Sequence, residues 1–328
     1  MKIGIIGAGS WGLALSIVFS ENNDVKLWVR RNEVLYYIKE NFESPDYLSG
    51  VKLSEKVFYT NDPKDFSDCQ VVFVVVPSKY FRETLRLFRE YINDKVIISC
   101  TKGIELGSLR LPSQIIEEEI GSKVVGVLSG PSHAEEVSRK LPCAITLAMS
   151  DMDLAKVIQN AISTNYFRVY VWDDIVGVEI AGAYKNVVAI SAGIVDGLGL
   201  GNNAKASLIT RGLHEIVKLG KALNGKIETF YGLSGIGDLI VTCTSKYSRN
   251  RNLGEMIAKG YKANDVISSS KMVAEGYYNT KAIKEISQRQ NLELPIANEV
   301  YEIIYNSKSP LDSLRDLMSR SLKEEFYF

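Results

Sequence analysis

The glycine-rich segment at the start of the chain constrains the fold more than any other feature. An apolar run, Ile3–Ile6, leads directly into Gly7-Ala8-Gly9-Ser10-Trp11-Gly12, a G-x-G-x-x-G pattern. Apolar residues then recur at helical spacing up to Phe19, and Asn22-Asn23 suits the end of that helix. A strand, a glycine turn and a helix in this order begin a Rossmann-type βαβ unit. The sequence therefore predicts an α/β fold from its first residues.

The three glycines of this turn predict a dinucleotide site. Gly7 permits the tight turn, Gly9 lets a pyrophosphate approach the backbone, and Gly12 allows the helix to pack closely on the strand. The first turn of the helix, which begins with Ser10 and Trp11, offers free N–H groups and a positive dipole end to the phosphates. A purely structural glycine turn is the alternative, but the position at the head of a βαβ unit favours the dinucleotide.

The first half of the chain alternates short β-type runs with helical patterns, which is typical of a parallel sheet with crossover helices. The predicted strands are Lys2–Ile6, Val25–Val29, Val57–Tyr59, Val71–Val76, Val96–Ser99, Val124–Leu128 and Ala144–Leu147. Val71–Val76 is apolar at every position, as expected of a strand that is covered on both faces. We therefore expect a Rossmann-type doubly wound parallel sheet in a dinucleotide-binding domain over residues 1–172.

After about Trp172 the pattern becomes helical and strand signals nearly vanish. The predicted helices are Val176–Ile194, Ala204–Leu223, Arg251–Lys259, Asn279–Gln290, Leu294–Tyr305 and Leu311–Arg320. In the second of them, Ile209, Leu213 and Val217 lie on one apolar stripe. We expect an all-α domain over residues 173–328 that binds the substrate and carries the catalytic groups.

Composition narrows the classes of partner. Lys+Arg and Asp+Glu both number 39, so no global basic field attracts nucleic acid or an anionic membrane. No apolar run reaches about 18 residues and no secretory pattern opens the chain, so we expect no membrane insertion. The cysteines are widely spaced, which favours reduced thiols in a cytoplasmic protein without a metal site: Cys69, Cys100, Cys143 and Cys243.

The end of the second predicted strand bears on the choice of dinucleotide. Arg30 and Arg31 stand there, where an NAD-selective site usually carries Asp or Glu for the ribose hydroxyls. Arginine can instead bind a 2′-phosphate through charge-assisted hydrogen bonds. We therefore favour NADP use, with dual use of NADPH and NADH possible. The alternative is a solvated arginine pair, with Glu33 binding the ribose.

Several polar clusters are candidates for the chemistry. Thr101-Lys102-Gly103 and Ser129–Ala134 each follow a predicted strand, at the edge where doubly wound sheets bind ligands. Lys185 and Asn186 stand in a helix that is rich in Gly and Ala, as where a ligand or another backbone comes close. Reduction of a ketone needs a proton donor and cations at the developing alkoxide. Lys185 and Lys102 could form that pair if the two domains face each other.

Together these motifs resemble the bacterial NAD(P)-dependent glycerol-3-phosphate dehydrogenases over residues 3 to about 325. The matching segments are Gly7–Gly12, Thr101–Glu105, Leu128–Ala134, Lys185–Val187, Gly235–Leu239, Ser248–Arg251 and Val273–Gly276. The resemblance implies reversible reduction of dihydroxyacetone phosphate to sn-glycerol 3-phosphate, which supplies the glycerol backbone of phospholipids. It also suggests a homodimer.

The resemblance assigns roles residue by residue. Lys185 would be the general acid–base, Lys102 would contact both substrate and cofactor, and Asp238 would bind a substrate hydroxyl or hold Lys185. The substrate site would be lined by Gly130, Ser132, Asp238, Ser248, Arg249 and Asn250. The cofactor would contact Ser10, Trp11, Arg30, Arg31, Ala134, Arg249, Val273 and Glu275. Asn186 and Thr242 are further contributors that the resemblance suggests less directly.

These roles are physically reasonable, and alternatives remain for some of them. The planar fork of Arg249 suits a phosphate dianion. Asp238 could instead be a helix N-cap without a catalytic part. The family more often has Leu at the position of Tyr184 and Ser at that of Thr101, and neither change removes a functional group. His133 and His214, the only histidines, are interpreted as packing residues.

Two other classes of protein compete with this interpretation. Reductases that resemble the 6-phosphogluconate or 3-hydroxyisobutyrate dehydrogenases place a catalytic Lys and Asn four residues apart on one helix face. Here Lys185 and Asn186 are adjacent, which argues against that class. A non-catalytic dinucleotide sensor should have lost Lys102 or Lys185, and both are present.

Overall fold

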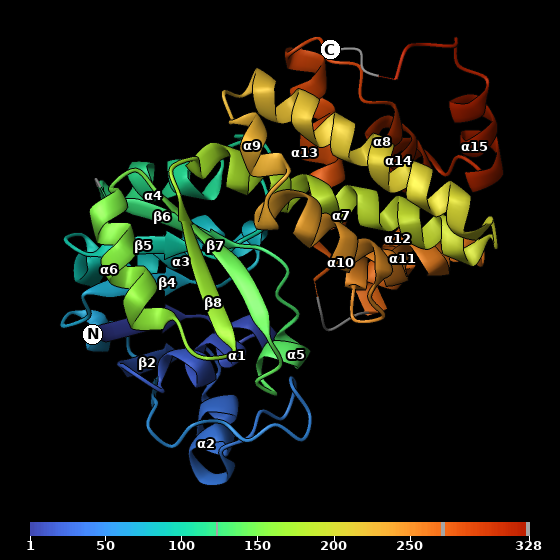
Figure 1. Cartoon of the computed structure of the whole chain (residues 1–328). Helices are drawn as coiled ribbons and strands as arrows, with labels where there is room; N and C mark the ends of the chain where they lie inside the picture. Colours follow the sequence, from blue (N-terminus) through green and yellow to red (C-terminus); the bar gives the residue numbers. More distant parts are fainter. Residues whose placement is uncertain (123, 270–272, 326–328) are drawn as a thin grey trace. The chain divides into compact units, whose positions relative to one another are not determined.

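The computed structural model describes residues 1–122, 124–269 and 273–325, and the chain divides into two compact units (Figure 1). Unit 1 comprises Met1–Lys102 and Arg110–Glu179, and unit 2 comprises Gly103–Leu109 and Ile180–Phe328. The short segment Gly103–Leu109 thus belongs to unit 2, although the chain on both sides of it belongs to unit 1. The division into functional domains at residues 172 and 173 stays a prediction.

Unit 1 contains one eight-stranded sheet with the order β3-β2-β1-β4-β5-β6-β7-β8. The strands are β1 (Lys2–Ile6), β2 (Asp24–Trp28), β3 (Phe58–Thr60), β4 (Val71–Val74), β5 (Val96–Ser99), β6 (Val125–Ser129), β7 (Cys143–Met149) and β8 (Phe167–Trp172). The strands from β1 to β6 are parallel, which confirms the predicted Rossmann-type class. β7 pairs antiparallel with β6, and β8 runs parallel to β7. The strand β8 and the reversed direction of the last two strands were not predicted.

Helices cover both faces of this sheet. They are α1 (Ser10–Phe19), α2 (Asn32–Asn41), η1 (Pro63–Phe66), α3 (Ser78–Ile92), α4 (Pro112–Ile120), α5 (Ala134–Val137) and α6 (Met152–Ile162). Neighbouring strand residues belong to separate apolar clusters, because successive side chains point to opposite faces. Phe73 lies in the cluster that contains Leu13 of α1, whereas Val72 lies in the cluster that contains Phe81 of α3. The sheet is therefore buried on both sides, as the apolar β4 sequence predicts.

Unit 2 is helical in the part of it that the structure describes. Its elements are α7 (Ile175–Gly197), α8 (Gly201–Ala222), α9 (Ile227–Phe230), a π-helical turn (Leu233–Gly237), α10 (Asp238–Thr244), α11 (Arg249–Ala258), α12 (Ala263–Ser269), α13 (Glu275–Arg289), α14 (Pro295–Asn306) and α15 (Pro310–Met318). The all-α character is confirmed, and the helices α9, α10 and α12 and the π-helical turn were not predicted. α7 begins in unit 1 and continues into unit 2.

Small residues let α11 approach α7 closely. A Cβ atom on Gly193 would lie 1.9 Å from the carbonyl oxygen of Arg251, and one on Gly254 would lie 2.0 Å from that of Ile190. Neither position can hold a side chain in this packing.

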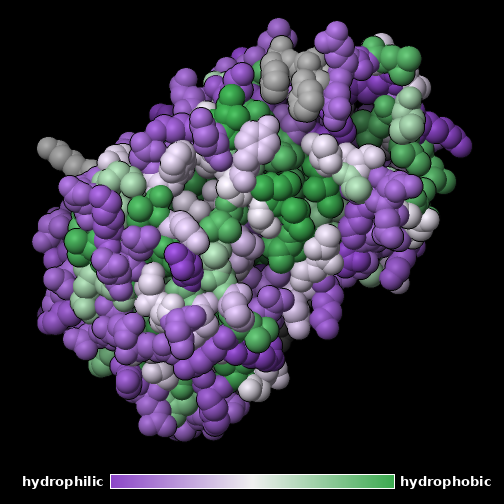
Figure 2. Space-filling view, in the orientation of Figure 1, coloured by the Kyte–Doolittle hydropathy of each residue, from purple (hydrophilic) through white to green (hydrophobic). Residues whose placement is uncertain are grey.

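α7 is long and apolar enough to cross a membrane, but 83% of its apolar window is buried inside the protein, which identifies it as a core helix. Figure 2 shows an apolar patch over unit 2 and a mainly hydrophilic surface over unit 1.

Replacement of Glu179 by Gln should flatten the dependence of stability on pH. Burial raises the pKa of this carboxyl from its usual 4.5 to about 7, against the hydrogen bonds donated by the Ser113 hydroxyl and N–H. The folded chain therefore binds the proton more tightly, and the free energy of unfolding falls as pH rises between these values, by up to about 3 kcal/mol. Gln stays neutral and can still bond Ser113. Urea unfolding of both proteins between about pH 5 and pH 8 measures the slopes, and parallel slopes would contradict the expectation.

Candidate active site

The glycine turn after β1 has the geometry of a dinucleotide cradle. Gly7 has φ +119°, and a Cβ atom there would lie 2.4 Å from the carbonyl oxygen of Val75. A Cβ atom on Gly12 would lie 1.8 Å from the carbonyl oxygen of Gly7, so α1 packs against the turn only because residue 12 is glycine. At Gly9, by contrast, a Cβ atom would meet nothing within 4 Å. The space beside Gly9 is therefore open to a ligand.

The start of α1 has hydrogen-bond donors directed at this turn. Gly9 is the N-cap, and within the described residues no side chain caps the helix. The first N–H groups of a helix need acceptors, and a phosphate is a suitable one. The indole Nε1 of Trp11 is also buried and has no hydrogen-bond partner among the described residues. These residues fit a dinucleotide, and Ser10 and Trp11 are where the sequence places them.

Two alanine substitutions should separate binding from packing in this turn. Gly12→Ala forces a Cβ atom into the Gly7 carbonyl, so we expect a loss of stability of at least about 2 kcal/mol. Gly9→Ala meets open space and should leave the thermal midpoint nearly unchanged, while it weakens NADPH binding because the Cβ atom occupies the space of the pyrophosphate. Thermal melts and titration calorimetry measure the two effects. Unchanged NADPH affinity of a folded Gly9→Ala protein would count against the cradle.

The arginine pair after β2 makes different contacts. The guanidinium carbon of Arg30 lies 5.9 Å from the centre of the Tyr80 ring. Arg31 forms an ion pair with Asp46 and a longer one, at 3.6 Å, with Glu33. Glu33, the alternative ribose partner, is thus already paired with Arg31. Of the two arginines, Arg31 is thus engaged in ion pairs with carboxylates, and NADP preference stays a prediction.

Lys102 lies among the predicted substrate residues of unit 1. Its Nζ donates to the carbonyl oxygen of Gly130 at 2.9 Å and lies 3.5 Å from the Ser132 Oγ, which itself donates to Gly130 O. Gly130 has φ +152° and lies close to the backbone of Ile145, which restricts the position to glycine. The next helix, α5, starts at Ala134. The structure therefore brings together Lys102, Gly130 and Ser132.

Lys185 lies in a buried polar cluster of unit 2. Its Nζ is 2.7 Å from the Asp238 Oδ1 and 2.7 Å from the Thr242 Oγ1. Lys185 is 5% exposed and Asp238 is 1% exposed. Burial of a charge is costly unless it is paired and hydrogen-bonded, and these two groups satisfy that condition for each other. Asp238 thus holds the lysine, while Gly237 occupies the N-cap position of α10.

The Ser248-Arg249-Asn250 segment forms the start of α11. The Ser248 Oγ caps the helix by accepting from the N–H of Arg251 at 3.2 Å, and Arg249 is the first helical residue. The amide of Asn250 is engaged inside the protein: Nδ2 donates to Asn186 Oδ1, and Oδ1 accepts from the N–H of Gly276, both at 2.9 Å. Ser248 and Asn250 therefore have structural roles in addition to any contact with the substrate.

The remaining predicted cofactor residues of unit 2 are next to this network. Glu275 is the first residue of α13, and Val273 precedes it by two positions. A Cβ atom on Gly276 would lie 2.5 Å from the carbonyl oxygen of Asn186, so the start of α13 packs directly on α7. Asn186, which the resemblance suggested less directly, is thus central to the packing around Lys185.

Sequence reasoning missed the supporting residue behind Tyr184. The Tyr184 hydroxyl donates to Glu215 at 2.6 Å, and the Glu215 carboxyl also accepts from the N–H groups of Ile296 and Ala297. Burial raises the pKa of Glu215 to about 7. In the sequence, Tyr184 departs from the family pattern, and that departure is the available signal for this contact.

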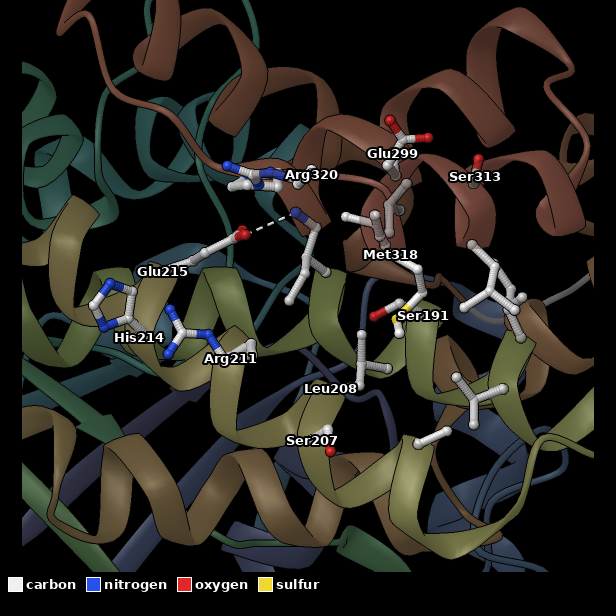
Figure 3. A pocket seen from close by; sticks show the side chains of 18 of the residues that line it. Ser191, Ser207, Leu208, Arg211, His214, Glu215, Glu299, Ser313, Met318 and Arg320 are labelled. Atoms are coloured by element: carbon white, nitrogen blue, oxygen red, sulfur yellow. Dashed lines mark hydrogen bonds between the residues drawn. The ribbon is translucent and has the colours of Figure 1, made fainter. Parts of the chain in front are cut away.

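A separate cavity of about 690 Å³ lies within unit 2 (Figure 3). It is lined by residues of α7, α8, α14 and α15 and of the chain that follows α15, and its wall is mostly apolar. Glu215, Arg211 and Ser313 are among its polar members. No predicted site residue lines this cavity, so it is not the predicted active site.

Comparison with known proteins identifies the family. The family model described as "NAD-dependent glycerol-3-phosphate dehydrogenase N-terminus" matches residues 2–155, and the corresponding C-terminus model matches residues 174–315. A protein of Thermotoga sp. (strain RQ2), named "Glycerol-3-phosphate dehydrogenase [NAD(P)+]", is 45% identical over 328 residues, which are 100% of this chain and 99% of the relative. A Bacillus anthracis protein of the same name is 45% identical over 330 residues, 99% of this chain and 97% of the relative.

Solved structures agree with these matches. The crystal structure of glycerol-3-phosphate dehydrogenase from Coxiella burnetii superposes with a TM-score of 0.93 at 36% identity and covers 97% of this chain and 99% of its own. The structure of the Saccharomyces cerevisiae enzyme gives a TM-score of 0.85 at 29% identity, over 98% of this chain and 99% of its own. The resemblance inferred from the motifs is confirmed. The chain belongs to the NAD-dependent glycerol-3-phosphate dehydrogenase family and is an NAD(P)-dependent oxidoreductase.

Proposed function

We propose that this protein catalyses the reversible reduction of dihydroxyacetone phosphate to sn-glycerol 3-phosphate, with NADPH or NADH as the reductant. The observation that carries the proposal is the buried ammonium group of Lys185, which Asp238 and Thr242 hold at 2.7 Å each. Such a group is a proton source fixed in one orientation. Family membership indicates the substrate class, and Lys185 is the group that can give a proton to the ketone oxygen.

Lys185 is proposed as the proton donor. A nicotinamide dinucleotide held on the glycine cradle would supply the hydride for the carbonyl carbon. The Lys185 ammonium would give its proton to the ketone oxygen as negative charge develops there. Asp238 and Thr242 keep Nζ in place, so that little reorganisation is needed during the reaction. In the reverse direction the neutral amine removes the proton from the alcohol. Lys102 is assigned a contact with substrate and cofactor, as the family resemblance implies.

Arg249 is proposed as the main phosphate ligand. Its guanidinium can bond two phosphate oxygens at once, which a single ammonium cannot do. Ser132, Ser248 and Gly130 would line the remainder of the substrate site, together with Asn250, whose amide already supports α11 and α13. Binding of the phosphate by Arg249 would also orient the carbonyl group, so part of the binding energy would lower the barrier of the chemical step.

The cofactor is proposed to lie on the cradle formed by Gly7, Gly9 and Gly12. The further contacts are assigned to Ser10, Trp11, Arg30, Arg31, Lys102, Ala134, Arg249, Val273 and Glu275. Arg30 favours NADPH, because its side chain carries a positive charge at the end of β2. We expect kcat/KM to be higher with NADPH than with NADH, and a large preference for NADH would contradict this assignment.

Three wider features are proposed on the same basis. Phospholipid synthesis is the proposed use of the product. The four free cysteines of the described chain suit the reducing cytoplasm: Cys69, Cys100, Cys143 and Cys243. A homodimer is consistent with the exposed apolar side chains of Tyr231 and Ile240 on unit 2, and light scattering after gel filtration measures it.

The direct test of the function compares two ketones. Consumption of NADPH is followed by absorbance, with dihydroxyacetone phosphate and with unphosphorylated dihydroxyacetone. Rapid turnover of the phosphorylated ketone and weak turnover of the other are expected. Equal rates with both ketones, or none with either, would contradict the proposal.

A further inference from the structure

Asn279 of α13 is a fully buried residue whose carboxamide joins two distant segments of unit 2. It is 0% exposed. Its Oδ1 accepts from the N–H of Ile104 at 3.1 Å, and its Nδ2 donates to the carbonyl oxygen of Ala183 at 3.1 Å. One side chain thus bonds the segment Gly103–Leu109 to α7.

Each of these segments adjoins a proposed catalytic lysine. Ile104 follows Lys102 by two residues, and Ala183 precedes Lys185 by two residues. Ile104 is itself buried, at 1% exposure, so its N–H requires an acceptor from the protein. Asn279 provides that acceptor. The contact therefore fixes the chain immediately after Lys102 to the helix that carries Lys185.

The two hydrogen bonds of Asn279 form a tether between the segment Gly103–Leu109 and α7, and the surrounding contacts restrict its movement. The start of α13 packs on α7 through Gly276, whose N–H also bonds Asn250, and Asn250 in turn bonds Asn186. Asn279 lies one turn further along the same helix. The helix can therefore not slide along α7 without breaking several buried hydrogen bonds, which are costly to leave unmade.

We propose that Asn279 is a positioning residue for the reaction: it holds the segment Gly103–Leu109 on α7, the helix of Lys185, and so fixes the backbone beside each of the two proposed catalytic lysines. The inference rests on the proposed function. Asn279 itself neither exchanges a proton nor binds the substrate. Its effect on the rate arises because small displacements of catalytic groups are costly.

The test uses Asn279→Ala and Asn279→Asp in the full chain. The alanine variant leaves the Ile104 N–H without its acceptor, and kcat/KM for dihydroxyacetone phosphate should fall at least about tenfold. The aspartate variant has the same shape. Its protonated carboxyl can accept from Ile104 and donate to Ala183, whereas its ionised form cannot donate. Its activity relative to the wild type should therefore recover as pH falls, and that of the alanine variant should not.

Ile286→Ala provides the matched control for simple loss of stability. Ile286 is a buried apolar residue of α13, 6% exposed, and lies two turns beyond Asn279. Its removal should lower the thermal midpoint but leave kcat/KM within about twofold. The pH profile of kcat/KM of each variant is divided by that of the wild type. The effects of ionisable groups that the proteins share, such as Lys185, Asp238 and Glu105, then cancel. Should the alanine variant not fold, the aspartate variant at low pH still tests the tether.

The outcomes separate the two proposals. An active wild type with unchanged kcat/KM in Asn279→Ala, or an Asn279→Asp protein without recovery at low pH, would overturn the positioning role alone. The same is true if Ile286→Ala loses as much activity as Asn279→Ala at equal loss of stability. A wild type that cannot reduce dihydroxyacetone phosphate would overturn the proposed function, and this inference with it.

Discussion

Replacement of Lys185 by Ala should lower kcat for dihydroxyacetone phosphate by about 10³-fold, within the range that a positioned acid–base group contributes. The change removes the group proposed to protonate the developing alkoxide. It also leaves Asp238 as a buried carboxylate without its ammonium partner. Initial rates at saturating NADPH and ketone measure kcat, and circular dichroism establishes whether the variant is folded.

Lys185→Arg is the control that separates charge from proton transfer. A guanidinium keeps the positive charge beside Asp238, but it does not give up a proton at working pH because its pKa lies far above that of an ammonium group. We expect this variant to be nearly as slow as the alanine variant. An arginine variant with the kcat of the wild type would show that only a positive charge is needed.

Replacement of Arg249 by Ala should lower kcat/KM for dihydroxyacetone phosphate by about 10²- to 10³-fold, the value of one or two charge-assisted hydrogen bonds. At saturating NADPH, where the proposed contact of Arg249 with the cofactor does not limit the rate, the loss with unphosphorylated dihydroxyacetone should be small, because that ketone has no phosphate for the guanidinium to bond. The ratio of the two kcat/KM values is the measured quantity.

Arg251→Ala is the matched control for this second prediction. Arg251 stands two residues further along α11, and its guanidinium is paired with Asp196 and Glu255. Its loss should affect stability but not the ratio between the ketones. Equal losses with both ketones in Arg249→Ala would contradict a phosphate-binding role for Arg249.

The sequence predicts the fold well where local pattern and tertiary environment agree. β4 is apolar throughout and is buried on both faces, and the glycine turn places glycine where the backbone leaves no room for a Cβ atom. β8 is the last strand of the sheet, and Phe167–Tyr170 alternates buried with exposed residues, a pattern that is typical of a half-buried strand and that the sequence analysis did not use. The reversed direction of β7 depends on how its connection packs, which no residue pattern specifies.

The site was predicted by residue type, but its contacts were not. Asp238 lies 53 residues from Lys185 in the chain, and Ile104 lies 175 residues from Asn279. The packing of whole helices determines which residues become such partners, so they cannot be predicted from spacing along the sequence. The same holds for Asn250, which was predicted as a substrate ligand and whose amide proves to be bonded to Asn186 and Gly276.

The most direct test of the central claim is a double-mutant cycle of Lys102→Met and Lys185→Met, measured as kcat/KM for dihydroxyacetone phosphate at high enzyme concentration. If both ammonium groups act on one substrate oxygen, the double variant should be little slower than the slower single variant, because residues that act as a unit are not additive. A double variant whose loss equals the product of the two single losses would show that the lysines act independently, and would contradict the account.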